Sequence, residues 1–321
     1  MHITVIGGTG HIGTYLVPRL VKAGHTVTVI SRGGRNPYHA HAAWKRVECI
    51  SLDRTAAEAE GTFGQQIRDL APDAVIDLLC FERDSAVQIV EALEGRIQHY
   101  IQCGTISVHG RCLVVPADET MPRRPISDYG RKKLAVEQYL LERARRDGFP
   151  ATVLHPGHIV GPGWSPVNPV GHTDPRVLGQ LARGEQVVLP HFGMETIHHV
   201  HADDVAQGFV RALDRRSNTL GEAFYIAAPN AVTLRGYAEA VAEWFGQQPN
   251  LNYRPWAPWA ASLSKEHAAS ALDHIGRSPH FSIAKARRLL GYEPRYTSLE
   301  ALYESVMWLA DNGVIEVSGQ F

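Results

Sequence analysis

The first half of the chain alternates short apolar runs with amphipathic stretches. The apolar runs have the length of buried strands, and apolar residues recur at helical spacing between them. This pattern predicts strands within residues 2–8, 25–32, 44–53, 71–81 and 96–105, and helices within 13–24, 64–73 and 85–95. Strands that alternate with helices of this length form βαβ units. We therefore expect an α/β protein with a doubly wound parallel sheet of Rossmann type, covered on both faces.

The spacing changes from about residue 150. A strand begins there, and a Pro-, Gly- and His-rich stretch without regular structure follows to about residue 176. Further helices are predicted within 174–185, 195–215, 234–246, 281–291 and 298–313, the last with Ser298 as its N-cap. We expect a Rossmann domain over 1–160 with a returning segment around 195–228, and a smaller, partly interleaved C-terminal substrate-binding portion over 161–194 and 229–321.

The composition excludes several classes of protein. Lys and Arg number 32 against 33 Asp and Glu, so the chain lacks the basic excess of a nucleic-acid or membrane-surface binder. No apolar stretch approaches the roughly 18 residues that span a bilayer, and the N-terminus shows no signal-peptide pattern. The four cysteines form no CxxC pair, as expected in a reducing compartment. A cytoplasmic enzyme with a small-molecule substrate is expected.

A glycine-rich segment connects the first predicted strand to the first predicted helix. Gly7, Gly10 and Gly13 have the spacing that suits a tight turn, close approach of a pyrophosphate and close helix–strand packing. The helix N-terminus adds unpaired N–H groups and partial positive charge. The residues of this segment that we expect to bind a dinucleotide are Gly7, Thr9, Gly10, His11, Ile12 and Gly13.

The segment GGTGHIG resembles the GGTGFIG-type loop of the extended short-chain dehydrogenase/reductase family, the NAD-dependent epimerase/dehydratases. The resemblance implies a dinucleotide across the carboxyl ends of the strands. Asp53 resembles the family's acidic residue beside the adenine ring, and Leu78 and Leu79 fall where the chain passes under the cofactor. HPGHIVGP (155–162) is similar to the RPxxVYGP segment that holds the nicotinamide carboxamide, which implies contacts from Pro156, His158 and Ile159.

The end of the second predicted strand bears on the choice of cofactor. An NAD-preferring site has an acidic residue there for the ribose 2′-hydroxyl. This chain has Ser31 and Arg32 instead, with Arg35 following. Because a guanidinium binds a 2′-phosphate that a carboxylate would repel, we expect NADP(H). NAD(H) beside solvent-facing arginines is the alternative.

Tyr129 and Lys133 form a Y-x-x-x-K pair at the start of a predicted helix, where residues four apart share one face. A phenol has a pKa near 10, too high for a base near neutral pH. We expect a neighbouring ammonium and an oxidised nicotinamide to favour the phenolate and lower this pKa. Tyr129 would then take a proton from a substrate hydroxyl as hydride leaves, or run the reverse reaction.

Neighbouring residues strengthen the match to the family. Leu134 and Glu137 continue its YGxxKLxxE pattern. CGTISVHG (103–110) resembles its SSxxVYG segment and implies that Thr105 is the hydroxyl at the reacting oxygen, with Ser107 as the alternative. This chain departs from the pattern at Gly104, usually Ser, and at His109, usually Tyr. Thr105, Tyr129 and Lys133 are the predicted catalytic residues.

The resemblance continues through VHADDVA (200–206) and KARRLLGYEP (285–294) but does not identify the substrate. In this family an arginine commonly holds the diphosphate of a sugar nucleotide, and this chain has Ile197 at the matching position. An asparagine is often found in the RPxxVYGP segment, and this chain has His158 there. Arg277 and Arg176 are alternatives for a phosphate, or surface charges. The residues predicted to bind substrate are Ser107, His109, His158 and Trp164.

The chain has 17 histidines, and seven of them lie between 155 and 201. His199 and His201 are two apart with Asp203 and Asp204 nearby, which admits a metal site. We favour roles for His201 and the two aspartates at a strand end and a helix cap, without a metal. The histidine-rich stretch 155–201 as a whole indicates an unusual substrate pocket.

The function expected is reversible hydride transfer at a carbinol carbon of a sugar or nucleotide sugar. The alternatives are an NADPH-dependent reductase of a non-nucleotide carbonyl compound and a non-enzymatic, dinucleotide-sensing or RNA-binding relative. The retained Tyr129/Lys133 pair and the neutral charge favour an enzyme. The resemblance also implies a homodimer formed through the Y-x-x-x-K helix and its neighbour.

Overall fold

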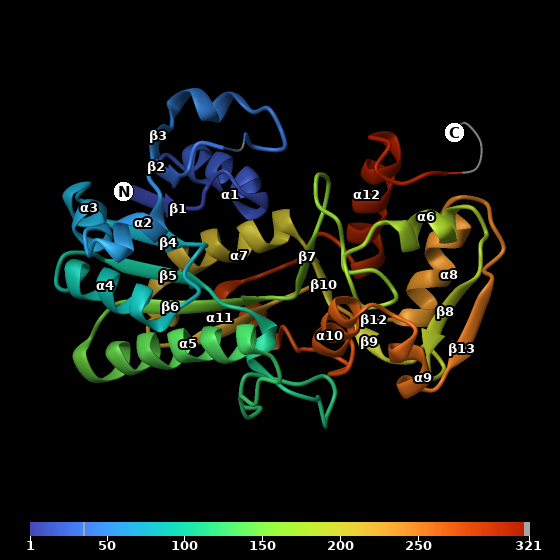
Figure 1. The fold of residues 1–321 in the computed structure, drawn as a ribbon. Coiled ribbons are helices and arrows are strands. Elements are labelled where there is room, and N and C mark those ends of the chain that lie inside the picture. The colour runs from blue at the N-terminus through green and yellow to red at the C-terminus, as the bar shows by residue number, and fades with distance from the viewer. Residues whose placement is uncertain (35, 318–321) are drawn as a thin grey trace.

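A seven-stranded parallel sheet runs through the left half of the molecule in Figure 1. The computed structural model describes residues 1–34 and 36–317 of the 321-residue chain. From edge to edge the strands are β11 (Ala223–Ile226), β6 (Ala151–Pro156), β5 (His99–Cys103), β4 (Ala74–Asp77), β1 (His2–Ile6), β2 (Thr26–Ser31) and β3 (Glu48–Ser51). All six pairings are parallel, and the order reverses between β1 and β4, where open α/β sheets bind ligands.

Helices cover both faces of this sheet, because alternate strand residues point to opposite sides. Val75 and Tyr100 pack with one layer of helices, whereas Ile76 and Ile101 pack with the other. The first layer contains α2 (Arg54–Ala59), α3 (Phe63–Asp69), α4 (Arg83–Leu93) and α5 (Asp128–Asp147). The second layer contains α1 (His11–Lys22), α7 (Ala202–Asp214) and α11 (Ala284–Leu290). The doubly wound Rossmann sheet expected from the sequence is thus confirmed.

A second apolar core lies to the right of the sheet in Figure 1 and draws its residues from Val160 to Ile315. Its helices are α6 (Arg176–Ala182), α8 (Leu234–Trp244), α9 (Trp256–Ala261), α10 (Lys265–His274) and α12 (Ser298–Asp311). Its paired strands are β7 (His158–Val160) with β10 (His199–His201), β9 (Thr196–Ile197) with β12 (Val232–Thr233), and β8 (Val187–Pro190) with β13 (Leu251–Arg254). Short 3₁₀ turns are η1 (Ala42–Arg46), η2 (Ile106–Val108) and η3 (Arg216–Asn218).

The last helix begins differently from the prediction. Its N-cap is Thr297 rather than Ser298. The Thr297 side chain accepts a hydrogen bond from the Glu300 N–H, and the Glu300 carboxylate accepts one from the Thr297 N–H. This reciprocal pair satisfies two backbone donors, which a cap at Ser298 would not. None of the described helices is long and apolar enough to cross a membrane.

Candidate active site

The loop between β1 and α1 has a backbone that requires glycine. Gly7 has a φ of 84°, and a Cβ there would lie 2.6 Å from Cγ of Leu79. A Cβ at Gly13 would lie 1.9 Å from the carbonyl oxygen of Gly8, so α1 approaches the loop more closely than a side chain allows. The N-cap of α1 is Gly10, which has no capping side chain, and the first N–H groups of the helix are therefore available to a ligand. This cradle fits a pyrophosphate.

A cleft of about 440 Å³ extends from this loop to the start of α5. It brings together residues from both apolar cores and most of the residues predicted from the sequence. The predicted residues on its wall are Gly7, Gly10, His11, Ile12, Leu78, Leu79, Thr105, Ser107, Tyr129, Lys133, Pro156, His158, Ile159 and Trp164.

The residues predicted to choose the cofactor lie beyond this wall. Ser31 ends β2, and Arg32 follows it as an exposed side chain. Among the described residues Arg32 forms no ion pair with a carboxylate. Asp53 is exposed and caps α2 by accepting a hydrogen bond from the Ala56 N–H. Arg35 lies outside the described residues.

Three other predicted residues also lie off the wall of the cleft. Thr9 is part of the turn between β1 and α1, and Gly13 packs behind that turn. His109 is fully buried, and its Nε2 hydrogen-bonds the Tyr225 hydroxyl. The structure therefore does not bring His109 to the surface that a substrate would touch.

The buried carboxylate of Asp77, which the sequence did not indicate, holds the turn after β4 in place. Asp77 accepts a hydrogen bond from the Leu79 N–H at 2.9 Å and one from the Tyr100 hydroxyl at 2.8 Å. The Arg54 guanidinium reaches both of its oxygens, at 2.8 and 2.9 Å. Because a buried charge is costly unless paired, this contact fixes the turn that carries Leu78 and Leu79 under the cleft.

Helix α5 brings the Y-x-x-x-K pair to the cleft. Ser127 caps the helix by accepting a hydrogen bond from the Gly130 N–H at 3.1 Å. Tyr129 and Lys133 follow one turn apart and both line the cleft. A Cβ at Gly130 would lie 2.2 Å from the carbonyl oxygen of Ser107, so glycine lets the helix start pack directly on the segment that carries Thr105.

Two backbone carbonyls hold the Lys133 ammonium in place. Its Nζ donates to the oxygens of Cys80 and Cys103 at 2.8 and 2.6 Å and lies 4.8 Å from the centre of the Phe81 ring. Burial lowers the pKa of Lys133. An ammonium has three protons, so one remains for a group in the cleft.

The Tyr129 hydroxyl lies in a desolvated environment, although 42% of the residue is exposed. Burial raises the pKa of Tyr129 to about 12, and a hydrogen bond with the Thr105 side chain acts in the opposite direction. Lys133 is not among the groups that shift this pKa. Two protons of the ammonium are directed at the carbonyls of Cys80 and Cys103, and the lowering of this pKa by Lys133 together with an oxidised nicotinamide stays a prediction.

Arg277, which the sequence offered as a phosphate ligand, has another role. It is buried, and its Nη1 and Nη2 donate to the carbonyl oxygen of Ile106 and to Oγ of Ser107, at 3.0 and 3.2 Å. It therefore supports the segment beside Thr105 from behind. Arg176 is exposed and pairs with Asp174.

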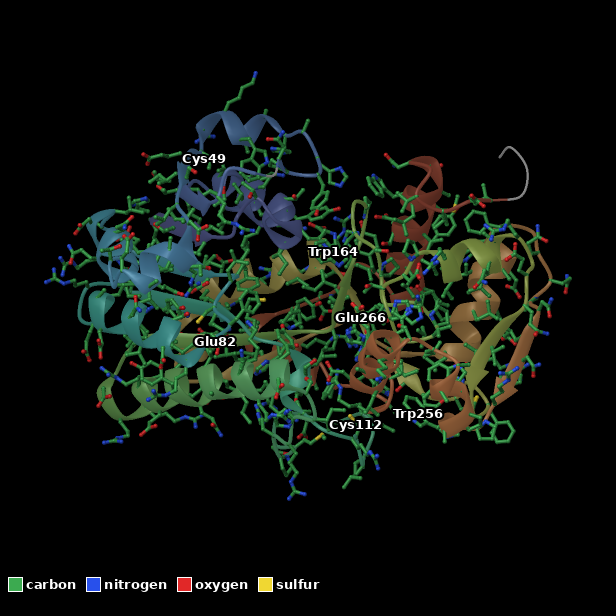
Figure 2. All side chains as sticks on the ribbon, in the orientation of Figure 1. Cys49, Glu82, Cys112, Trp164, Trp256 and Glu266 are labelled. Atoms are coloured by element: carbon green, nitrogen blue, oxygen red, sulfur yellow. The ribbon has the colours of Figure 1, made fainter. Side chains whose placement is uncertain are left out.

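Histidine and tryptophan side chains line the opposite end of the cleft, together with the carboxyl group of Asp273. Burial keeps the pKa of His158 well below its usual value and also lowers that of His274. Trp164 lies between the two halves of the molecule and stacks on His11, with ring centres 5.0 Å apart (Figure 2). Asp273 and His274 were missed by the sequence analysis because they come from α10, a helix that was not predicted.

The histidines and aspartates around β10 already have protein partners. Nε2 of His199 lies 3.2 Å from the carbonyl oxygen of Val167. Nδ1 of His201 accepts a hydrogen bond from the Asp203 N–H and so caps α7, and Asp203 pairs with Arg19 at 2.6 Å. Within the described part of the chain, no group of three or more His, Cys, Asp and Glu side chains is arranged to hold a metal ion.

Comparison with known proteins agrees with this geometry. The model of the NAD-dependent epimerase/dehydratase family matches residues 3–227. The chain belongs to this family. It is an enzyme of the extended short-chain dehydrogenase/reductase type, as the sequence motifs predicted, and the family is described as NAD-dependent.

The individual relatives share less than 30% of their residues with this chain. A UDP-glucose 4-epimerase of Corynebacterium glutamicum is 24% identical, over 95% of this chain and 94% of its own length. A 2′-dehydrokanamycin reductase of Streptomyces kanamyceticus is 28% identical, over 81% of this chain and 71% of its own. The structure of a UDP-glucose 4-epimerase from Thermotoga maritima with UDP-glucose superimposes with a TM-score of 0.74 and 22% identity, covering 97% of this chain and 99% of that one. These levels of identity leave the substrate open.

Proposed function

We propose that this enzyme catalyses reversible, NADP(H)-dependent hydride transfer at a carbinol carbon of a sugar or nucleotide sugar. The observation that carries the proposal is the single cleft whose wall contains the glycine loop, Thr105, Tyr129 and Lys133. A nicotinamide dinucleotide supplies a hydride acceptor or donor when it is bound. Side chains of this protein would transfer the proton and stabilise the charge that develops on the reacting oxygen.

Tyr129 is the proton-transfer group. In the oxidative direction its phenolate accepts the proton of the substrate hydroxyl, and in the reductive direction its phenol returns a proton to the carbonyl oxygen. The Thr105 side chain lowers the pKa of the Tyr129 phenol, against the effect of burial, and would contact the same reacting oxygen. Lys133, held by two carbonyls, places a fixed positive charge beside this oxygen when negative charge develops there.

The preference for NADP(H) rests on Arg32. It is exposed directly after Ser31 and has no carboxylate partner among the described residues, so it is available to a 2′-phosphate. Of the next two carboxylates in the sequence, Glu48 accepts a hydrogen bond from the Thr28 hydroxyl and Asp53 caps α2. We therefore expect NADPH to bind more tightly than NADH.

A second candidate is an NADPH-dependent reductase of a carbonyl compound without a nucleotide. It is favoured by the charge of the cleft wall, on which Lys133 is the single cationic side chain among the residues described. Arg277 is already bound to Ile106 and Ser107, which removes it as a ligand for a diphosphate. The likeness to a 2′-dehydrokanamycin reductase is consistent with this candidate.

The nucleotide that copurifies with the enzyme separates these candidates. An epimerase recycles its cofactor on the protein, so it should retain NADP or NAD through gel filtration. A reductase must exchange its cofactor at every turnover, so dilution and gel filtration should strip it. Mass spectrometry of the released nucleotide would identify it, and NADH binding more tightly than NADPH in a titration would contradict the cofactor proposal.

We also propose a homodimer formed through α4 and α5, a cytoplasmic location, and no nucleic-acid or membrane partner. Helices α4 and α5 pack side by side on the outer face of the sheet (Figure 1). The net charge of −1 supports the absence of a polyanion partner. The two apolar cores support the predicted division into a dinucleotide-binding domain and a substrate-binding portion.

A further inference from the structure

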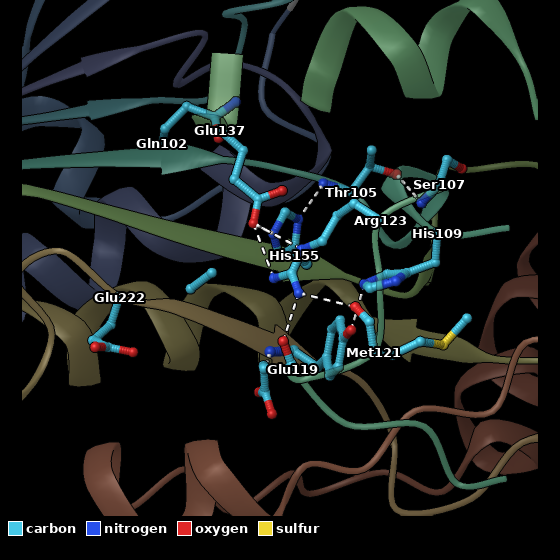
Figure 3. A network of polar contacts seen from close by, with 12 residues as sticks. Gln102, Thr105, Ser107, His109, Glu119, Met121, Arg123, Glu137, His155 and Glu222 are labelled. Atoms are coloured by element: carbon cyan, nitrogen blue, oxygen red, sulfur yellow. Dashed lines mark hydrogen bonds and ion pairs between the residues drawn. The ribbon is translucent and has the colours of Figure 1, made fainter. Parts of the chain in front are cut away.

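A network of polar side chains lies behind the cleft (Figure 3). It joins Glu137 of α5, His155 of β6 and Arg123 of the segment that precedes α5. The Arg123 guanidinium donates to Oε1 of Glu137 from Nε and Nη2, at 3.2 and 3.0 Å. The same oxygen lies 3.3 Å from Nε2 of His155, within ion-pair reach but longer than a well-formed hydrogen bond. The His155 and Glu137 side chains are 0% and 4% exposed.

The other nitrogen of His155 faces the catalytic segment. The backbone N–H of Thr105 donates to Nδ1 of His155 at 3.0 Å. An imidazole that accepts at Nδ1 carries its proton at Nε2, the atom that faces Glu137. Burial alone would raise the pKa of Glu137, and the Arg123 guanidinium that binds its carboxylate acts in the opposite direction. Glu137 is therefore a carboxylate that favours this tautomer.

Gly104 makes room for the imidazole. A Cβ at this position would lie 2.4 Å from Nδ1 and 2.7 Å from Cε1 of His155. The sequence departs from the family pattern at both positions, with Gly104 in place of a serine and His155 in place of an arginine. In the structure the two positions are in contact. The ring of His155 fills the space that a side chain at position 104 would need.

We propose that His155 is a positioning residue, which fixes Thr105 through its backbone and so directs the Thr105 hydroxyl at the Tyr129 phenol. Glu137 and Arg123 hold the imidazole in the tautomer that accepts the N–H. An arginine at position 155 would offer only donors to that N–H. The inference rests on the proposed roles of Thr105 and Tyr129.

The test follows the Tyr129 hydroxyl and needs neither substrate nor cofactor. The enzyme is prepared with 3,5-difluorotyrosine at position 129, whose fluorines lower the phenol's pKa into a range where the protein stays folded. The ¹⁹F NMR signal of this single label is titrated with pH. A hydrogen bond from Thr105 favours the phenolate, so displacement of Thr105 should raise the pKa that the label reports.

Two variants of similar size separate the two nitrogens of His155. In His155→Asn the amide oxygen replaces Nδ1 as the acceptor for Thr105, whereas in His155→Gln the amide reaches toward Glu137 and the acceptor is lost. We expect His155→Asn to retain the wild-type pKa and His155→Gln to raise it by about half a unit or more. His99→Gln is the control, because His99 is a fully buried histidine of β5 whose ring bonds Thr152 instead.

Equal pKa values in wild type and His155→Gln would overturn the proposal, as would equal shifts in His155→Asn, His155→Gln and His99→Gln. Gly104→Ala provides an independent approach, because its methyl group would displace the His155 ring. It should raise the pKa of the label as His155→Gln does, and combining the two substitutions should add little. If Tyr129→Phe proved active, the proposed function would fail, but this titration would still decide whether His155 positions Thr105.

Discussion

The two ends of the cleft are built in different ways. At the cofactor end, the shape comes from the backbone: Gly7 and Gly13 stand where a Cβ would collide with Leu79 or with the carbonyl of Gly8. At the substrate end, the wall consists of side chains such as His158, His274 and Trp164, brought together by tertiary packing. A site made by backbone imposes a spacing on the sequence. A site made by side chains from distant elements imposes none.

The largest expected effect comes from removal of the Tyr129 hydroxyl, which should lower turnover without changing the affinity for the cofactor. Tyr129→Phe should lower kcat on the order of 10²- to 10⁴-fold, because proton transfer to the reacting oxygen is lost. Affinity for NADPH, followed by its fluorescence, should stay at the wild-type value because the glycine loop is untouched. Tyr139→Phe, on the same helix, is the matched control and should retain activity. A fully active Tyr129→Phe would remove this residue from the mechanism.

Acid should destabilise the substrate side, where buried histidines are concentrated. Burial holds the pKa of His198 at about 4 and that of His199 at about 3, against about 6.5 in an unfolded chain. Below pH 6.5 the unfolded chain therefore binds protons that the folded protein does not, and the free energy of unfolding falls as the pH falls. Each of these residues should remove about 2 kcal/mol by pH 5.

Hydrogen exchange can localise this acid effect. At pH 5.5 compared with pH 8, protection should be lost in α8 and α12 before it is lost in α3 and α4. An equal loss of protection in all four helices, or a urea midpoint that does not change between pH 8 and pH 5, would contradict the prediction.

A methyl group at Gly13 should weaken cofactor binding without changing the substrate end of the cleft. The Cβ of Gly13→Ala would lie 1.9 Å from the backbone oxygen of Gly8, so the loop must move away from α1. Affinity for NADPH should fall by about tenfold or more, which is ~1.4 kcal/mol. Gly179→Ala in α6 is the control, since its Cβ would lie 3.2 Å from the end of the flexible Arg183 side chain and no closer than 3.4 Å to the backbone of Glu316. Unchanged NADPH affinity in Gly13→Ala would show that this contact does not shape the cofactor site.

The smallest expected effect concerns the choice between the two cofactors. Arg32→Glu should reduce the preference for NADPH over NADH by about fivefold to tenfold, because a carboxylate repels the 2′-phosphate and accepts from the 2′-hydroxyl. The exposed Arg215 provides the matched control, and Arg215→Glu should leave the ratio of the two dissociation constants unchanged. A ratio that Arg32→Glu does not move would place the 2′-phosphate elsewhere.

The sequence predicted the sheet and helix α5 because both depend on local patterns. Buried strands alternate with amphipathic helices, and Tyr129 and Lys133 share a helical face whatever surrounds them. It missed α10, which buries only Ala271 completely, and therefore missed Asp273 and His274 on the cleft wall. It also offered Arg277 for a phosphate, since a contact with Ile106, 171 residues away, leaves no trace in spacing.

The orientation of the Lys133 ammonium could not be predicted from the sequence for a related reason. The Y-x-x-x-K spacing correctly indicates that Lys133 is near Tyr129, but not where the ammonium points. Two of its protons are directed at the carbonyl oxygens of Cys80, in the turn after β4, and of Cys103, the last residue of β5. Burial, which depends on the whole fold, then decides the direction of the shift in the pKa of Tyr129.

Transfer of deuterium from C4-deuterated NADPH tests the central claim most directly. The enzyme would be incubated with a panel of keto sugars, with and without a nucleoside diphosphate, and the products analysed by mass spectrometry. We predict that the wild-type enzyme gives a product one deuterium heavier with at least one member of the panel, and that Tyr129→Phe does not. Deuterium transfer at the wild-type rate by Tyr129→Phe would contradict the account, as would the absence of transfer by wild-type enzyme that has been freed of bound nucleotide and reloaded with the labelled NADPH.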